Sequence, residues 1–216
     1  MTQDQHRIKR IRLTDTADID EAVRQTAAVL SDGGVVLTPT DTVYGLVCLL
    51  GSLEAVETIF AMKQRPSGWR LPVIVADLSQ AENDLPLIWN DAARILARTY
   101  WPGTLTIACG VQKNVEGLLE GRVEAAIRAP KYLFIQTLAR TLGPLLMTSA
   151  NRHGDDTPHT MEGALMVLTT PPALAIDGGL LNGAPSTLVN VNLPVPVIER
   201  VGVIPANEIE EVLKNA

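Results

Sequence analysis

In this 216-residue chain, one pair of residues whose types and spacing suggest chemistry is Lys63 and Arg65, in the segment AMKQRP. They stand at the end of a segment with helical spacing, and Pro66 follows them, so the helix cannot continue. We therefore expect both side chains to project from the helix end into a loop, where two cations can hold an anion. A lysine in this place can also simply oppose the helix dipole, and Arg65 can simply be solvated.

A second candidate is the polar segment TPTDT at residues 38–42, which follows the apolar, β-branched run VVLT. Such a run predicts a buried strand. A strand end that opens into threonine and aspartate side chains is a common place for ligands in α/β folds. The alternative is a solvated turn in which Asp41 and the threonines bond only the local backbone. The sequence leaves both interpretations open.

The segment LLMTSAN resembles a strand that runs out into a polar loop. Ser149 lacks the G-x-S-x-G environment of a nucleophilic serine, and Asn151 two residues later favours a hydrogen-bonding loop instead. His153, Asp155 and Asp156 could be grouped as metal ligands, but no second cluster of ligands supports them. No protein-bound metal is therefore predicted, and His153 is expected to be exposed.

Composition limits the classes of function that remain. The net charge of −6 and the pI near 5.1 argue against a broad nucleic-acid-binding surface. Cys48 and Cys109 lie in apolar runs without partners at zinc-ligand spacing, so we expect buried free thiols, as in a reducing compartment. The N-terminus has no apolar segment for secretion, and no run approaches about 18 apolar residues. The sequence predicts a soluble cytoplasmic protein without membrane contact.

The elements that must position these residues follow from periodicity and from turn signals. Helices are expected over residues 18–30, 53–62, 90–100, 133–142 and 206–214. Strands are expected over residues 35–38, 71–75, 104–109, 124–128, 145–149, 174–176, 188–191 and 197–200. Residues 1–13 are predicted to be a basic arm or first strand, and residues 14–216 a single domain, because no linker or repeat divides them. Interspersed helices and strands, with short connections in the last third, predict an α/β fold with a mixed parallel and antiparallel sheet.

Four of these stretches together resemble one family. TPTDTVYGL, the K-x-R-P of residues 63–66, TSAN and the PSTLV of residues 185–189 are similar to the motifs of the threonylcarbamoyl-AMP synthase (YrdC-like) family. WPGTLT, Arg128 at a strand end and the R-x-G that begins at Arg200 add weaker matches in the same order. The resemblance spans roughly residues 33–202. Neither the dinucleotide fingerprint nor the P-loop motif is present.

The resemblance implies a twisted mixed sheet around a concave cationic cleft. It also implies a reaction that joins L-threonine, bicarbonate and ATP into threonylcarbamoyl-AMP and releases pyrophosphate. The product would serve the modification of position 37 of tRNA, so tRNA or a downstream transferase complex is an expected partner. ATP would be a substrate and would bring Mg²⁺ with it. Such a reaction relies on positioning and charge stabilisation and requires no protein nucleophile.

The family motifs imply roles for individual residues. Lys63 and Arg65 would be the catalytic cations, in contact with the phosphates and the carboxylated amino acid. Thr40, Thr42 and Tyr44 would shape the threonine pocket. The nucleotide-binding set implied by the resemblance is Lys63, Arg65, Arg128, Ser149, Asn151, Ser186 and Arg200.

Three positions depart from the family pattern. Tyr132 stands where a histidine is common, Thr104 where proline is usual, and Asn190 where an aspartate is common. A tyrosine can donate one hydrogen bond, but it cannot become cationic near neutral pH. Two alternatives therefore stay open: a divergent relative that binds RNA without catalysis, and an enzyme that forms a carbamoyl-adenylate. The acidic total and the 4% of aromatic residues count against RNA binding, and the short chain counts against the second alternative.

Overall fold

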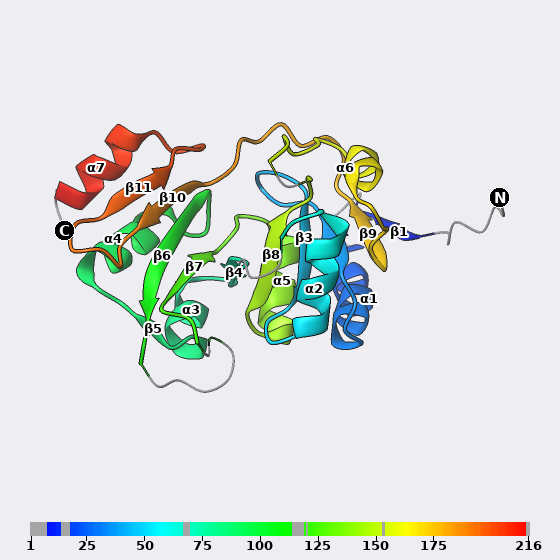
Figure 1. Cartoon of the computed structure of the whole chain (residues 1–216), viewed down its shortest axis with the longest axis horizontal. Coiled ribbons are helices and arrows are strands. Elements are labelled where there is room, and N and C mark those ends of the chain that lie inside the picture. The colour runs from blue at the N-terminus through cyan, green and yellow to red at the C-terminus, as the bar shows by residue number, and fades with distance from the viewer. Residues whose placement is uncertain are drawn as a thin grey trace.

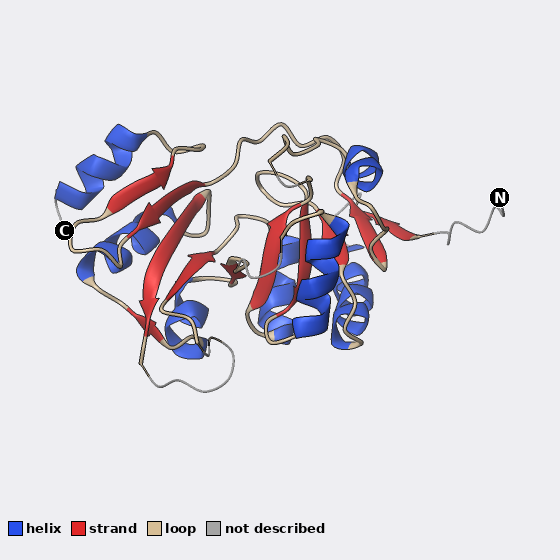
Figure 2. Cartoon of the chain, in the orientation of Figure 1, coloured by secondary structure: helices blue, strands red, loops and turns tan. Residues whose placement is uncertain are grey.

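The structure is a computed structural model that describes residues 8–13, 18–66, 70–113, 119, 121–152 and 154–214. One eleven-stranded, mixed sheet runs through the molecule, with helices packed against it (Figures 1 and 2). The strands are β1 Lys9–Arg12, β2 Val36–Thr38, β3 Gly45–Leu49, β4 Val73–Ile74, β5 Leu87–Ile88, β6 Leu105–Val111, β7 Glu124–Arg128, β8 Leu145–Ser149, β9 Leu174–Asp177, β10 Thr187–Asn190 and β11 Val197–Arg200. The helices are α1 Ile19–Ser31, α2 Leu53–Met62, α3 Leu78–Asp84, α4 Asp91–Tyr100, α5 Leu133–Leu142, α6 Met161–Val167 and α7 Ala206–Lys214.

The sheet order is β1-β9-β2-β3-β8-β4-β7-β6-β10-β11, with β5 paired to β6. The pairs β1–β9, β9–β2, β4–β7 and β6–β10 are parallel, and the other pairs are antiparallel. The mixed α/β sheet that the sequence predicted is therefore confirmed. Residues 9–12 of the basic N-terminal segment form the edge strand β1, and residues 1–7 lie outside the described part of the chain.

The two halves of the sheet are connected through one short strand, β4, near the middle of the strand order. Strand β4 has two residues, and it pairs with β8 on one side and with β7 on the other. On the β8 side lie β3, β2, β9 and β1, and on the β7 side lie β6, β10 and β11. Figure 1 shows these two groups of strands side by side, with the segment after β9 crossing from one to the other. This arrangement brings polar loops from both groups together.

Two hydrophobic clusters cover the faces of the sheet. One contains side chains of α1 and α5 packed against β2, β8 and β9, while the other contains side chains of α2, α4 and α7. Cys48 and Cys109 are buried and free, as predicted, and burial raises the pKa of each thiol to about 12. No helix in the described part of the chain has the length and apolar character needed to cross a membrane.

The five predicted helices and the eight predicted strands are confirmed, with shifts at their ends. Helices α3 and α6 were not predicted from the sequence; they have seven residues each, and their first turns are capped by the side chains of Asp77 and Thr160. Strand β3 and the short β5 were also not predicted. Strand β3 is buried over Gly45–Cys48 and so shows no alternation of apolar and polar residues.

Asn190, one of the three departures, finds partners on the neighbouring strand β11, on β7 beyond β6, and in the chain just after β10. Its Nδ2 donates to Glu124 at 2.9 Å and to Glu199 at 2.8 Å, and its Oδ1 accepts from the backbone N–H of Asn192 at 3.0 Å. An aspartate could accept hydrogen bonds in this place but could not donate them. The amide is therefore the side chain that suits two flanking carboxylates.

We predict that Asn190→Asp lowers the free energy of unfolding by about 2–4 kcal/mol, because two hydrogen bonds to charged groups are replaced by like-charge repulsion. Urea unfolding measures the loss, and about 0.5 M salt should recover part of it by screening. Asn83→Asp is the control, because Asn83 is exposed and bonds only Ser79 through its side chain; its effect should stay within about 0.5 kcal/mol. An Asn190→Asp protein as stable as the parent would contradict this account.

Candidate functional site

The end of α2 fixes the directions of the two cations. The N–H of Gln64 donates to the carbonyl of Ala61 at 3.1 Å, and the N–H of Arg65 donates to that of Phe60 at 2.9 Å. These two bonds form a Schellman cap, in which the residue after the helix is left-handed. Gln64 has a φ of 51°, although glycine is the usual residue there. The cap turns the chain out of the helix at Lys63, as the sequence predicted.

Lys63 is 2% exposed, and its ammonium group is surrounded by oxygen atoms. Nζ donates to the carbonyls of Ser149 at 2.5 Å and Asn151 at 2.7 Å, and to Oδ1 of Asn151 at 3.1 Å. Burial, and then the charge of Arg65, lowers the pKa of Lys63 to about 8. Each of the three N–H groups thus has a partner within the protein, so a ligand would have to replace one of them.

The S-x-N segment after β8 forms the hydrogen-bonding loop that was predicted. Ser149 Oγ donates to Asn151 Oδ1 at 2.5 Å, and Asn151 Nδ2 donates to the carbonyls of Arg152 and Asp155 at 2.8 and 2.6 Å. His153 lies outside the described residues. Among the residues that are described, no group of three or more histidine, cysteine, aspartate or glutamate side chains could hold a metal.

Arg65 is half-buried beside the same helix end. Its guanidinium carbon lies 5.8 Å from the centre of the Phe60 ring, within the range of a cation–π contact. Burial lowers the pKa of Arg65. The contact with Phe60 gives the guanidinium of Arg65 a preferred orientation, close to the oxygen atoms that surround the ammonium group of Lys63.

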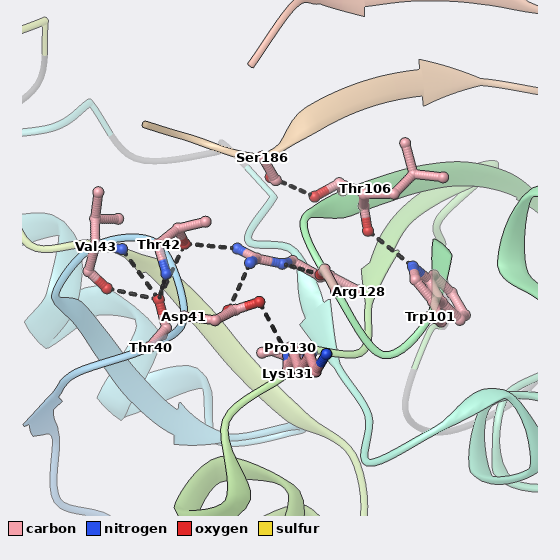
Figure 3. Close-up of polar contacts among 12 residues, drawn as sticks. Thr40, Asp41, Thr42, Val43, Trp101, Thr106, Arg128, Pro130, Lys131 and Ser186 are labelled. Atoms are coloured by element: carbon pink, nitrogen blue, oxygen red, sulfur yellow. Dashed lines mark hydrogen bonds and ion pairs between the residues drawn. The ribbon is translucent and has the colours of Figure 1, made fainter. Parts of the chain in front are cut away.

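The loop between β2 and β3 is shaped by the hydroxyl of Thr40. Thr40 Oγ1 accepts the N–H groups of Thr42 and Val43, each at 3.1 Å, and donates to the carbonyl of Val43 at 2.7 Å (Figure 3). The Thr40 and Thr42 hydroxyls lie 3.0 Å apart. Thr40 therefore makes a local turn, as one interpretation of the sequence expected, but the loop is buried rather than solvated, since Thr40 and Thr42 are 4% and 2% exposed.

Arg128, at the end of β7, binds this loop from the other group of strands. Its Nη2 donates to Asp41 Oδ1 at 2.6 Å, its Nη1 to Thr42 Oγ1 at 2.9 Å and its Nε to the carbonyl of Gly103 at 3.0 Å (Figure 3). The second oxygen of Asp41 accepts the N–H of Lys131 at 2.9 Å. Sequence reasoning missed Asp41 as the partner of Arg128, and the available signal was that Asp41 follows one predicted strand closely and Arg128 ends another.

The hydroxyl of Tyr44 makes two hydrogen bonds within the protein. This side chain is fully buried, Oη donates to the carbonyl of Gly179 at 2.8 Å, and it accepts the N–H of Gly178 at 3.0 Å. Burial raises the pKa of Tyr44 to about 12. Tyr132 lies beside the same segment, because a Cβ added at Gly178 would be 3.0 Å from its Oη. Both tyrosines thus contact the segment that leads from β9 toward β10.

Ser186 and Arg200 meet on the far side of Arg128. Ser186 accepts Arg200 Nε at its carbonyl, at 3.1 Å, and Arg200 Nη2 at its hydroxyl, at 3.2 Å. The same hydroxyl lies 2.7 Å from Thr106 Oγ1 (Figure 3). The third departure, Thr104, offers its carbonyl to the N–H of Thr187 at 3.1 Å. Burial is the main cause of a lowered pKa at Arg128, and the charge of Arg200 adds to it. The two guanidinium groups are therefore electrostatic neighbours.

The predicted residues thus gather in three adjoining groups. Lys63 joins Ser149 and Asn151, Thr42 joins Arg128, and Ser186 joins Arg200. The first group touches the loop after β2, because the N–H of Ala150 donates to the carbonyl of Tyr44 at 2.8 Å. Paired hydroxyls and cations from both halves of the sheet suit a ligand with several anionic groups.

Comparison with known proteins agrees with this geometry. A family model named for Sua5, YciO and YrdC, with the description telomere recombination, matches residues 28–202. The threonylcarbamoyl-AMP synthase of Bacillus subtilis is 35% identical over 198 residues, which cover 90% of this chain and 57% of that protein. The chain therefore spans a little under three fifths of that relative's length.

Two solved structures are also similar. The crystal structure of Pyrococcus abyssi Sua5 complexed with L-threonine matches 95% of this chain and 60% of its own, with a TM-score of 0.83 and 29% identity. The crystal structure of Escherichia coli YciO matches 97% of this chain and 100% of its own, with a TM-score of 0.79 and 28% identity. The fold described above is thus shared with both proteins.

We predict that Gln64→Gly raises the free energy of unfolding by about 0.5–1 kcal/mol, because glycine adopts a positive φ without the strain that a side chain causes. Gln64→Ala is the matched control, since alanine also carries a Cβ and should bring no gain. Urea unfolding of both variants beside the parent protein measures the difference. A Gln64→Gly variant that is less stable than the parent would show that the side chain of Gln64 contributes more than the backbone strain costs.

Proposed function

The chain belongs to the Sua5/YciO/YrdC family, and from this membership we propose that it is an L-threonylcarbamoyladenylate synthase, a nucleotidyltransferase. It would form threonylcarbamoyl-AMP and pyrophosphate from L-threonine, bicarbonate and ATP. Relatives under this description include the B. subtilis protein, and Sua5 has been solved with L-threonine bound.

The observation that carries the proposal is the contact between the S-x-N segment, which Lys63 bonds, and the loop after β2. Lys63 holds the S-x-N segment, and the N–H of Ala150 in that segment donates to the carbonyl of Tyr44 at 2.8 Å. A cation for phosphate therefore adjoins the loop proposed to bind threonine. A reaction between a carbamate and an α-phosphate requires such neighbours, because it brings two anions together.

In the proposed reaction the amino group of threonine combines with bicarbonate to form a carbamate, with loss of water. A carbamate oxygen then attacks the α-phosphorus of ATP, and the bond from that phosphorus to the pyrophosphate oxygen breaks. Negative charge that collects on the phosphates would be stabilised by Lys63, Arg65 and Arg200, with Mg²⁺ arriving through ATP. Ser149, Asn151 and Ser186 would bond the nucleotide. Arg128 would add its unused N–H groups rather than net charge, since Asp41 is paired with it.

Thr40, Thr42 and Tyr44 are proposed to shape the threonine pocket. Thr40 and Thr42 would do so through the loop itself. Tyr44 would act on the pocket wall, because its hydroxyl already bonds Gly178 and Gly179. We place the reaction in the cytoplasm, where two buried free thiols persist, and expect a transferase complex that acts on tRNA to consume the product.

A second candidate rests on Tyr132, which stands where the family pattern has a histidine and cannot become cationic near neutral pH. This candidate is a divergent relative in which the site binds RNA without catalysis. The two candidates differ in turnover, so one assay separates them.

The assay measures pyrophosphate released by purified protein with ATP and Mg²⁺. We expect release to depend on both L-threonine and bicarbonate, and Arg65→Ala to lower kcat/KM at least tenfold, or about 1.4 kcal/mol of transition-state stabilisation. Arg94→Ala, which removes an arginine paired with Glu82 on the surface, is the control and should be fully active. Absence of release with all substrates present would overturn the synthase, and salt-sensitive RNA binding without turnover would support the second candidate.

The pH profile tests Lys63 separately. Its pKa of about 8 means that the ammonium loses its charge as the pH rises through this value, so we expect kcat/KM to fall above about pH 8. Lys63→Arg keeps the charge and should move this decline to higher pH in whatever activity remains. A flat wild-type profile from pH 7 to 9.5 would show that the charge of Lys63 is not needed.

A further inference from the structure

The ion pair between Asp41 and Arg128 connects the two groups of strands that the short β4 joins. Asp41 belongs to the loop after β2, and Arg128 ends β7 on the other side of β4. We propose that Asp41 is a positioning residue, which sets the placement of the threonine loop, residues 40–44, relative to the nucleotide-binding residues Arg128, Ser186 and Arg200. This inference rests on the proposed function and assigns a role to a residue outside the predicted site.

Both oxygens of Asp41 are engaged with the β7 side. Oδ1 accepts from Arg128 Nη2 at 2.6 Å, and Oδ2 accepts from the N–H of Lys131 at 2.9 Å (Figure 3). The side chains of Asp41 and Arg128 are only 11% and 10% exposed. A pair shielded from water is weakly screened and holds its geometry better than a surface ion pair does. The carboxylate therefore acts as a two-point brace between the two segments.

The brace is separate from the local structure of the threonine loop. Thr40 fixes that loop through bonds to Thr42 and Val43, none of which involves the Asp41 side chain. Changing Asp41 should therefore leave the internal shape of the loop intact and alter where the loop stands relative to Arg128. An effect on placement is expected in kcat rather than in the affinity for threonine, because rate depends steeply on the alignment of reacting groups.

Arg128 is held on three sides, so it transmits the placement. Its Nη1 and Nε bond Thr42 and Gly103, in addition to the bond with Asp41. Three of its five N–H groups thus donate to the protein, and at most two remain for a ligand. The guanidinium is neighbour to Arg200, which Ser186 holds on the nucleotide side. A shift of Asp41 would reach both proposed substrate sites through this one residue.

Asp41→Glu is the main test, because it keeps the charge but lengthens the brace by one methylene. We expect kcat for pyrophosphate release to fall at least tenfold while KM for L-threonine changes less than threefold. Asp41→Asn, which keeps the length and removes the charge, should show the same split. Thermal melting of each variant checks that the loss exceeds any loss of folded protein.

Asp77 offers a matched control, because its carboxylate also bonds one arginine and one backbone N–H. Oδ2 lies 3.3 Å from Arg140 Nη2, and Oδ1 accepts the N–H of Gln80 at 3.0 Å, at the start of α3. Asp77→Glu and Asp77→Asn should retain kcat within about twofold. Equal losses at Asp77 and Asp41 would mean that any such pair matters only for folding, and the proposal would be wrong.

Hydrogen exchange at the amide of Lys131 reports on the brace without turnover. We expect exchange at least tenfold faster in Asp41→Asn than in the parent, with unchanged exchange in Asp77→Asn. If kcat is retained in both Asp41 variants, or if threonine affinity falls in parallel with kcat, Asp41 is not a positioning residue. If the parent itself releases no pyrophosphate, the proposed function fails, and unchanged Lys131 exchange would then overturn the brace independently.

Discussion

A buried ammonium group has to be surrounded by oxygen atoms, and this constraint organises the region around Lys63. Its Nζ bonds Ser149 and Asn151 instead of water, so the end of α2 and the end of β8 are held together by one side chain. The Schellman cap supplies the necessary exit from the helix, and the S-x-N segment supplies carbonyl and amide oxygens. Burial disfavours the charged form, so it lowers the pKa of Lys63. The buried ammonium group is therefore a cation that an arriving anion readily stabilises.

Arg128 shows a different solution to the same constraint. Its charge is offset by Asp41, so it enters the site as a set of oriented N–H donors with little net charge. Lys63, by contrast, bonds neutral oxygens of Ser149 and Asn151 among the residues that the structure describes. An anionic substrate would therefore experience the field of Lys63, with Arg65 and Arg200 nearby, while Arg128 would contribute geometry. This division could not be inferred from the sequence, in which both residues count simply as cations.

The sequence predicted those parts of the fold that depend on local patterns. The period of α2 and the proline after it placed Lys63 and Arg65 at a helix end, and alternation or β-branching placed most strands. Strand β3 was missed because it is buried on both faces, which removes the alternating pattern. The pairing of Asp41 with Arg128 joins residues 87 positions apart, and only the sheet order brings them together. Local patterns in a single sequence do not predict a contact between residues so far apart in the chain.

The three residues that depart from the family pattern lie apart from Lys63 and the oxygen atoms that bond its ammonium group. Asn190 is explained by two glutamates, one on the neighbouring strand β11 and one on β7, and Thr104 contributes a backbone carbonyl, which any residue type would supply. Tyr132 lies beside Gly178, and Gly178 belongs to the segment that Tyr44 also bonds. Two of the three substitutions therefore alter the scaffold and leave the proposed catalytic cations untouched. The third, Tyr132, places a neutral hydroxyl beside the segment after β9, where the family pattern has a histidine that could carry charge, so the one departure that could alter the proposed site lies away from the proposed catalytic cations.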